Sequence, residues 1–287
     1  MSDPACSFCG HPVPLEWSLC PHCARPSLYP NVRVAEQESE RDALAFRYRL
    51  AVQDAESRGC GEAVRAFEAA AGTTVAVLSR SLAEVERLAN SDRQLYATYY
   101  QLLEAEVKLP DDDAWDPLRR LADEVLFPGY KEKIRFAALS LDGAGLPGYG
   151  DFALVLKEEM IEHRASVLAG NSALLLRKWD YNVPTGSRAA WKERARLCVA
   201  KLAARLKPSM TEADFAALLL RSGARREDDE IVEVHIWGPL SSWTFERVVL
   251  SRPAGPRRLI RARVKALRAK LAEAGIDLEE RGGAWMP

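Results

Sequence analysis

The chain has 287 residues, of which 48% are hydrophobic and 28% are charged, and its formal net charge at pH 7 is −1. This composition is typical of folded globular proteins with one large domain or two ordinary ones, and it excludes an intrinsically disordered chain. The longest apolar runs, such as residues 216–220 and 173–176, are far shorter than the roughly 18 to 20 residues that cross a bilayer, so we expect no membrane-spanning segment.

The N-terminal sequence, MSDPACSFCG, has neither the basic start nor the apolar core of a secretory signal. We therefore expect a cytoplasmic protein. In that reducing compartment, the crowding of four of the six cysteines into the first 23 residues indicates metal binding rather than disulfide bonds.

The segment CSFCGHPVPLEWSLCPHCARP contains two Cys-x-x-Cys knuckles separated by ten residues. Each knuckle directs two thiolates at one point, and ten residues allow the chain to turn and return. The ligands predicted for one tetrahedral, structural Zn²⁺ are Cys6, Cys9, Cys20 and Cys23. His11 or His22 could replace a cysteine as a ligand. Residues 1–30 are thus predicted to form a zinc ribbon that binds a partner protein or nucleic acid.

Residues 31–127 have a helical pattern. Gly and Pro are absent from residues 35–58 and 73–109, and apolar residues recur in both stretches at spacings of three and four. We predict four or five packed helices in this section. Cys60 within it, and Cys198 further on, are interpreted as buried small side chains rather than nucleophiles.

Residues 128–287 change in character, with several glycines and short β-type runs between helices. The predicted strands are residues 134–141, 152–157, 164–168, 231–237 and 247–250. The predicted helices are residues 187–206, 211–221 and 256–274. The sequence therefore predicts an α+β fold class, with a small zinc ribbon, a helical middle section and a mixed C-terminal domain.

A segment near the C-terminal end is strongly basic, although the net charge of the chain is close to zero. Between Arg252 and Lys270 there are eight basic residues and no acidic one. The predicted amphipathic helix 256–272 could bind nucleic acid or an acidic partner with its charged face. The alternative interpretation is an ordinary solvated helix face.

Two segments of the C-terminal domain place polar side chains in a β context. In EDDEIVEVHIWGPL, alternation puts Glu233 and His235 on one face of a strand, with Ile231 beside them. An acid–base pair and an exposed ion pair on an edge strand are both open interpretations. In HRASVLAGNS, Arg164 could hold a phosphate or carboxylate bidentately, or it could be a surface residue at a strand end.

Five short motifs in residues 134–250 follow one another in a recognisable order. They are Y-G-x-x-x-x-V-L-K, R-A-S-V, N-S, V-E-V-H-I-W-G-P-L and E-R-V-V-L. This succession resembles bacterial and phage-encoded proteins with the ADP-ribosyltransferase-like fold. A strand glutamate followed by Gly and a short apolar unit is also similar to the end of DNA-targeting ADP-ribosyltransferase toxins, in which that glutamate is catalytic.

The resemblance implies a set of site residues. Glu233 would hydrogen-bond the ribose of NAD⁺ and stabilise oxocarbenium character in the transition state. His235 would lie beside it in the catalytic group. Ser140 stands in the first strand, where the family commonly has His or Arg. The residues implied to bind NAD⁺ are Arg164 at the pyrophosphate, Tyr149 stacked on nicotinamide, Asn171 and Ser172.

Three functions are compatible with these features of the sequence. The first is an NAD⁺-dependent ADP-ribosyltransferase acting on a macromolecular target, as an effector of the toxin or phage-defence type. The second is a metal-independent ribonuclease that uses His235, Glu233, Arg164 and the basic helix. The third is a noncatalytic adaptor in which the ribbon and the basic helix bind nucleic acid or protein.

Overall fold

A computed structural model describes residues 6, 8–14, 17, 19–91, 93–97, 100, 115–251 and 258–281 of the chain. Its α-helices are α1 (Pro30–Ala35), α2 (Glu38–Ser57), α3 (Gly61–Gly72), α4 (Leu82–Ala89), α6 (Trp115–Leu126), α7 (Glu158–Ile161), α8 (Ser172–Lys178), α9 (Arg194–Leu202), α10 (Glu212–Leu219) and α11 (Arg258–Glu273). Its strands are β1 (Val75–Arg80), β2 (Ile134–Ser140), β3 (Phe152–Leu156), β4 (Ala165–Leu168), β5 (Arg188–Ala190), β6 (Glu233–Trp237), β7 (Phe245–Leu250) and β8 (Asp277–Glu280). None of the described helices combines the length and apolar character that crossing a bilayer demands.

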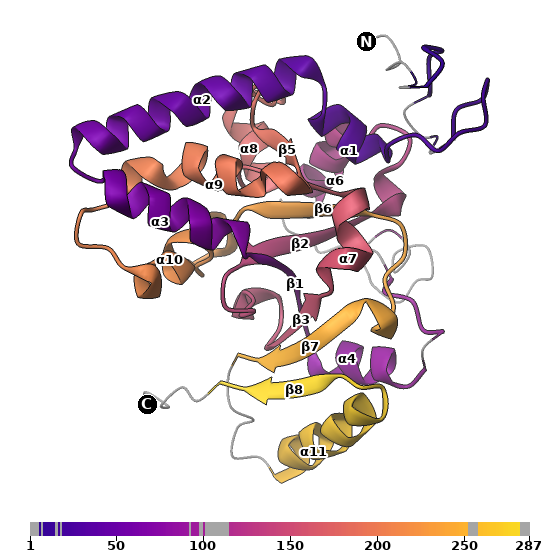
Figure 1. Cartoon of the computed structure of the whole chain (residues 1–287). Coiled ribbons are helices and arrows are strands. Elements are labelled where there is room, and N and C mark those ends of the chain that lie inside the picture. The colour runs from indigo at the N-terminus through magenta and orange to yellow at the C-terminus, as the bar shows by residue number, and fades with distance from the viewer. Residues whose placement is uncertain are drawn as a thin grey trace.

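The strands form one eight-stranded sheet in the order β5-β4-β6-β2-β1-β3-β7-β8 (Figure 1). Neighbouring strands are antiparallel from β5 to β7, and only β7 and β8 run parallel. The parallel pair requires a crossover that returns the chain to its starting edge, and α11 provides it. This combination of helices and a mixed sheet confirms the predicted α+β class.

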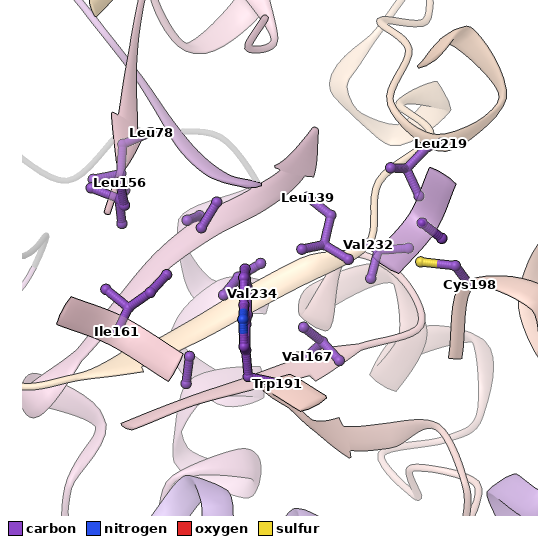
Figure 2. Close-up of a cluster of buried hydrophobic side chains, with 14 of the residues drawn as sticks. Leu78, Leu139, Leu156, Ile161, Val167, Trp191, Cys198, Leu219, Val232 and Val234 are labelled. Atoms are coloured by element: carbon purple, nitrogen blue, oxygen red, sulfur yellow. The ribbon is translucent and has the colours of Figure 1, made fainter. Parts of the chain in front are cut away.

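One face of the sheet holds the main hydrophobic core. Val234 and Ile236 of β6 are fully buried there beside Leu139 of β2. Helices α2, α3, α9 and α10 cover this face around the centre of the sheet (Figure 1). Figure 2 shows side chains from the strands meeting Trp191 and Cys198 from the covering layer. The alternation of β6 therefore sends every second residue into this core and leaves Glu233 and His235 for the opposite face.

The opposite face is covered at its β4–β6–β2 end by α6 and α8. Leu126 of α6 and Leu176 of α8 pack on Ile134, Leu168 and Trp237 of these strands. Polar side chains on this face are thus enclosed between a sheet and two helices. That enclosure positions the candidate site described below.

Strand β1 corrects the prediction of helix across residues 73–109. Val75–Arg80 is extended and lies between β2 and β3, and α4 begins only at Leu82. Ala76 and Leu78 enter the main core while Val77 is buried on the other face. A strand buried on both faces is a continuous apolar run, which periodicity cannot distinguish from a buried helix. The predicted domain boundary at residue 127 stays a prediction. Strand β1, from the section before it, pairs with β2 and β3 from the section after it.

The remaining element predictions agree with the structure in most places. The five strands predicted in residues 128–287 correspond to β2, β3, β4, β6 and β7, and the two helices predicted after residue 210 correspond to α10 and α11. The helix predicted for residues 187–206 is wrong at its start, because Arg188–Ala190 forms β5. Three residues are too few for a period-2 pattern to be detected.

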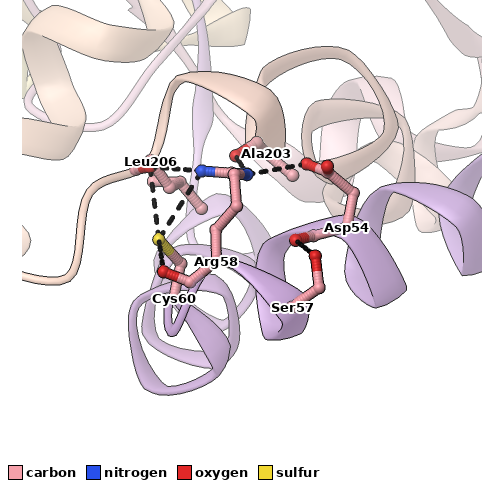
Figure 3. A network of polar contacts seen from close by, with 6 residues as sticks. All are labelled: Asp54, Ser57, Arg58, Cys60, Ala203 and Leu206. Carbon is pink, nitrogen blue, oxygen red and sulfur yellow. Dashed lines mark hydrogen bonds and ion pairs between the residues drawn. The ribbon is translucent and has the colours of Figure 1, made fainter.

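Both non-ribbon cysteines are buried. Cys60 is 1% exposed at the turn between α2 and α3, where Arg58 donates to the carbonyl oxygens of Ala203 and Leu206 and so joins this turn to the end of α9 (Figure 3). Cys198 is fully buried, and burial raises the pKa of its thiol to about 12. A protonated, enclosed thiol is inert, as the sequence predicts for this residue.

Candidate functional site

The four N-terminal cysteines lie together. The sulfur-to-sulfur distance is 3.8 Å between Cys6 and Cys23 and 3.5 Å between Cys9 and Cys20, and all four sulfurs lie within 4.8 Å of one another. Zinc–sulfur bonds of about 2.3 Å in a tetrahedron place sulfurs about 3.8 Å apart. The cluster therefore fits a zinc-ribbon-like site that could hold a structural metal ion such as zinc.

Local backbone geometry forms the two knuckles. In the first, the amide of Phe8 donates to Cys6 Sγ at 3.4 Å, and Gly10 turns the chain with φ +73°. In the second, Ala24 takes the same left-handed region at φ +55°, and its amide donates to the carbonyl of Cys20. Backbone amides, that of Cys23 first, lower the pKa of Cys20 to about 6. The turn therefore stabilises the thiolate of Cys20. Burial and the neighbouring cysteine side chains instead raise the pKa of Cys9 to about 12.

The two ribbon histidines stack on each other, with ring centroids 3.6 Å apart. With Cys9 they form a second group of ligand atoms within 4.8 Å. The substitution of a histidine for a cysteine ligand therefore stays open beside the complete set of four sulfurs.

Helix α1 fastens the ribbon to the sheet. Arg33 donates from its guanidinium to the carbonyl oxygens of Val13, Pro14 and Trp17 in the ribbon. Two residues earlier, the side-chain nitrogen Nδ2 of Asn31 donates to the backbone carbonyl of His235 at 2.9 Å. One short helix thus contacts both the cysteine-rich segment and the strand that carries Glu233.

A second polar cluster surrounds Glu233 on the α6–α8 face. Glu233 is 2% exposed and His235 is 4% exposed, and His235 Nε2 lies 3.3 Å from Glu233 Oε2. The backbone amide of Ser172, at the start of α8, donates to the same oxygen at 2.8 Å. The guanidinium of Arg119 on α6 lies 3.5 Å from Oε1. Strand β6 lies between β4 and β2 and is therefore not an edge strand. This rules out the interpretation of Glu233 and His235 as an exposed ion pair on an edge strand.

Electrostatics keep the carboxylate charged and the imidazole neutral. Burial alone would raise the pKa of Glu233, but the contacts with His235, Arg119 and the Ser172 amide outweigh it, and its pKa lies below the ordinary value. Burial lowers the pKa of His235 despite the neighbouring carboxylate. A neutral His235 then donates its Nε2 hydrogen to Glu233 and keeps Nδ1 as an acceptor.

Further polar groups gather around this pair. On α6, Asp123 lies one turn after Arg119 and accepts a hydrogen bond of 2.8 Å from Tyr100. Burial raises the pKa of Asp123 to about 6. Tyr149, Asp123 and Glu233 all lie close enough to raise the pKa of Arg119. Arg80, at the end of β1, lies close enough to Arg119 for the two charges to interact.

Two buried oxygen atoms in this cluster have no hydrogen-bond partner among the described residues. They are Ser172 Oγ and Asp123 Oδ1. Buried polar atoms in folded proteins are nearly always paired, so such atoms mark places where a ligand or water binds. We call the set of Arg119, Asp123, Ser172, Glu233 and His235 the Glu233 cluster.

Other sequence-predicted residues have local partners instead. Arg164 donates to the carbonyl oxygens of Met160, Trp237 and Pro239, so its hydrogens already bond the backbone. Asn171 caps α8 by accepting from the amides of Ala173 and Leu174. Ser140 is fully buried, and its hydroxyl donates to Asp142 at 3.0 Å. Tyr149, by contrast, lies close enough to Arg119 to affect its pKa.

The glycine-rich turn between β2 and β3 packs directly on β1. A side chain at Gly145 would place its Cβ 2.1 Å from Ser79 Oγ, and one at Gly150 would place it 2.2 Å from the backbone of Arg80. Ser79 Oγ also accepts a hydrogen bond from the amide of Leu146. Close packing therefore explains the need for glycine at these two positions.

The basic face of α11 is largely paired within the chain. Arg263 contacts Glu86, Lys270 contacts Asn90, and Arg268 contacts the carbonyl of Leu278. These contacts attach α11 to α4 and β8. They reduce the number of basic groups that are available to an external anion.

The sequence interpretation missed Arg119, Asp123 and Arg80. Arg119 and Asp123 are i and i+4 on a helix that also carries Arg120 and Glu124, which are exposed. Nothing in the local pattern separates the inward pair from the outward pair. No protein-family model matches the chain, and no curated protein is similar to it in sequence, so the ADP-ribosyltransferase resemblance rests on the short motifs alone.

Proposed function

We propose that the Glu233 cluster is the catalytic centre of an NAD⁺-dependent ADP-ribosyltransferase that modifies a macromolecular target, as an effector of the toxin or phage-defence type. The observation that supports this is a fully buried carboxylate held in its charged form beside unpartnered buried oxygens of Ser172 and Asp123. A buried charge is costly, and strongly perturbed groups of this kind concentrate at functional sites.

The chemistry requires a fixed negative charge near the reacting carbon. The bond between ribose C1′ and the nicotinamide nitrogen breaks, and its electron pair leaves with neutral nicotinamide. A nucleophile of the target then bonds to C1′ and loses its proton. The carboxylate of Glu233 stabilises the positive charge that develops at the ribose, while His235 and the Ser172 amide hold the carboxylate in place.

The residues that we assign to the phosphates of NAD⁺ differ from the one that the motifs imply. Because Arg164 bonds three carbonyl oxygens, we assign the phosphates of the dinucleotide to Arg119, with Arg80 beside it. Tyr149 lies near Arg119, so we retain for it the role that the resemblance implies, which is stacking on nicotinamide.

The test is release of nicotinamide from NAD⁺ by the full-length, zinc-loaded chain in the presence of DNA, RNA or cell protein. We expect Glu233→Gln to reduce release by about 10²-fold or more, as for removal of other electrostatic catalytic groups. Glu246→Gln is the matched control, because Glu246 lies on β7 of the same sheet in a half-exposed ion pair with Arg247. Equal release by both variants, or no release with any target, contradicts the proposal.

We also propose that the ribbon binds Zn²⁺ for structure and helps select the target. Among the described residues of the ribbon, the exposed large apolar side chains are Phe8, Trp17, Leu19 and Leu28. Arg25 lies over the ring of Phe8 at 4.9 Å. Exposed aromatic groups beside a cation suit binding to nucleic acid or to a protein surface. Loss of target modification but not of NAD⁺ cleavage to water in Phe8→Ala would support this division of roles.

A ribonuclease is the second candidate, favoured by the contact between His235 and Glu233 at 3.3 Å. A carboxylate and an imidazole at this distance can share acid and base roles in phosphodiester cleavage. Cleavage of RNA without added metal, lost in His235→Ala and retained in His163→Ala, would favour this candidate over the first. Unaltered RNA removes it.

A further inference from the structure

A small cavity lies behind His235, on the side of α1. Its volume is about 10 Å³, and it is enclosed by α1, the end of α6, and strands β4, β5 and β6. Its apolar lining includes Val34, Leu126 and Phe127. Its polar lining consists of Asn31, Ser166, Tyr130, Arg188 and His235. About 10 to 15 Å³ is the smallest volume that accommodates one water molecule.

Three lining residues have a buried polar atom without a hydrogen-bond partner among the described residues. These atoms are Asn31 Oδ1, Tyr130 Oη and Arg188 Nε. Asn31 and Tyr130 are 4% and 2% exposed, so bulk solvent does not reach them. The nearest carboxylate to Arg188 Nε, that of Glu40, is 4.0 Å away and too distant for a hydrogen bond.

The orientation of the Asn31 amide is fixed by its nitrogen. Nδ2 donates towards the carbonyl oxygens of Arg164 and His235 and towards Ser166 Oγ, at 2.9 to 3.2 Å. Since Nδ2 faces these acceptors, Oδ1 is left as an acceptor at the cavity. Tyr130 keeps its proton, because burial raises its pKa to about 12, and its hydroxyl is therefore a donor.

We propose that this cavity binds one ordered water molecule that completes the hydrogen bonds of His235. The water accepts from Tyr130 Oη and Arg188 Nε, and it donates to Asn31 Oδ1 and to Nδ1 of His235. All four hydrogen-bonding positions of the water molecule are then used, which is the most that a buried water can form. An anion fits less well, because it would face the lone pairs of Asn31 Oδ1 and of His235 Nδ1.

The consequence is a defined imidazole tautomer. A water that donates to Nδ1 leaves the ring hydrogen on Nε2, where it points at Glu233 Oε2. Asn31, Tyr130 and Arg188 are thus positioning residues, since they act on Glu233 only through the water and His235. The inference does not rest on the proposed enzymatic activity, because the tautomer and the water can be observed directly.

The experiment combines a crystal structure of the full-length, zinc-loaded chain with nitrogen-15 spectra of its four histidine rings. We expect a water peak within hydrogen-bond distance of Asn31 Oδ1 and Tyr130 Oη, and the Nε2-protonated form of His235. Tyr130→Phe removes one partner, so it should weaken the peak and shift the Nδ1 resonance of His235. Arg188→Lys removes the Nε donor and serves if Tyr130→Phe does not fold.

Tyr48→Phe is the matched control, because the Tyr48 hydroxyl bonds Glu68 between α2 and α3, the helices that cover the other face of the sheet. It should leave the His235 resonances unchanged. The proposal is overturned if the cavity contains no electron density. It is also overturned if a bromide peak appears at this position after halide exchange. An Nδ1-protonated His235 in the wild type, or identical His235 spectra in the wild type and both cavity variants, also overturns it.

Discussion

The cysteine cluster of the ribbon and the Glu233 cluster balance charge in different ways. In the ribbon, four sulfur atoms converge on one point, and a cation bound at that point would stabilise all of them as thiolates. In the Glu233 cluster, the chain supplies its own cation, Arg119, together with a backbone amide and a neutral imidazole. The first arrangement would need a ligand in order to fold, whereas the carboxylate of Glu233 already has a cation of the same chain beside it.

The surroundings of the two clusters differ in the same sense. The apolar residue buried with the cysteines is Val13, which is too little to order the ribbon by itself. The Glu233 cluster lies on a sheet whose other face is packed by a large continuous core. The stability of the ribbon should therefore depend on metal binding, and the stability of the sheet should depend on the packing of its core.

Removal of the metal should have the largest effect. Apparent zinc binding in structural sites of this kind contributes about 10 to 16 kcal/mol near pH 7, so chelation or Cys9→Ser should unfold residues 6–29 while the sheet persists. Zinc content and amide hydrogen exchange measure the two outcomes. His11→Ala is the control and should keep one zinc per chain. Full zinc occupancy in Cys9→Ser, or unfolding of the whole chain on chelation, would contradict the separation of the two regions.

Truncation of a core side chain should show the reverse pattern. Leu139 on β2 is fully buried in the main core, and Leu139→Ala should lower the free energy of unfolding of the sheet by about 2 to 5 kcal/mol. Zinc content should not change. Leu259→Ala, at a residue that is 71% exposed, should alter stability by less than about 0.5 kcal/mol. Equal losses in the two variants would show that the sheet is not held by this core.

The charge balance of the Glu233 cluster predicts a pH dependence. The pKa of Asp123 is raised to about 6 from its ordinary 3.8, so the folded state binds the proton more tightly than the unfolded state does. The wild type should therefore become more stable relative to Asp123→Asn as pH falls from 7.5 to 4, by about 2 to 3 kcal/mol. Denaturant titrations at both pH values measure the difference. A difference that is constant with pH would mean that Asp123 is not the buried, proton-binding group described here.

The smallest effect is expected at the basic helix. Arg263 pairs with Glu86 across α11 and α4, and both side chains are partly exposed. Arg263→Ala should lower the unfolding free energy by less than about 1 kcal/mol and should do so less at high salt. A loss of several kcal/mol would place α11 among the elements on which the sheet depends. Thermal unfolding at two salt concentrations distinguishes these outcomes.

Local spacing in the sequence was sufficient to predict the ribbon, because its turns and ligands lie within residues 6–23. Alternation was also sufficient to place Glu233 and His235 on one face of a strand. Their burial could not be predicted, since it depends on β6 lying between β4 and β2, and strand order is a property of the whole fold.

The polar neighbours of Glu233 show a further limit of sequence patterns. Arg119 and Asp123 look like ordinary surface residues of an amphipathic helix, yet they face the sheet. Arg164 and Asn171 look like ligand-binding residues, yet their hydrogen bonds go to nearby backbone groups. A charged side chain in a sequence does not reveal whether its partner will be a ligand or the chain itself.

The position of β6 also has a consequence for how the protein is made. Strands β2 and β4 leave the ribosome well before β6, which pairs with both of them. Until residue 237 has emerged, each of these strands has an edge of unpaired backbone groups, and such edges associate readily with other chains. Glu233 and His235 arrive on the strand that closes this gap. A nascent chain that stops just short of β6 therefore lacks the candidate site and leaves the edges of both β2 and β4 open to other chains.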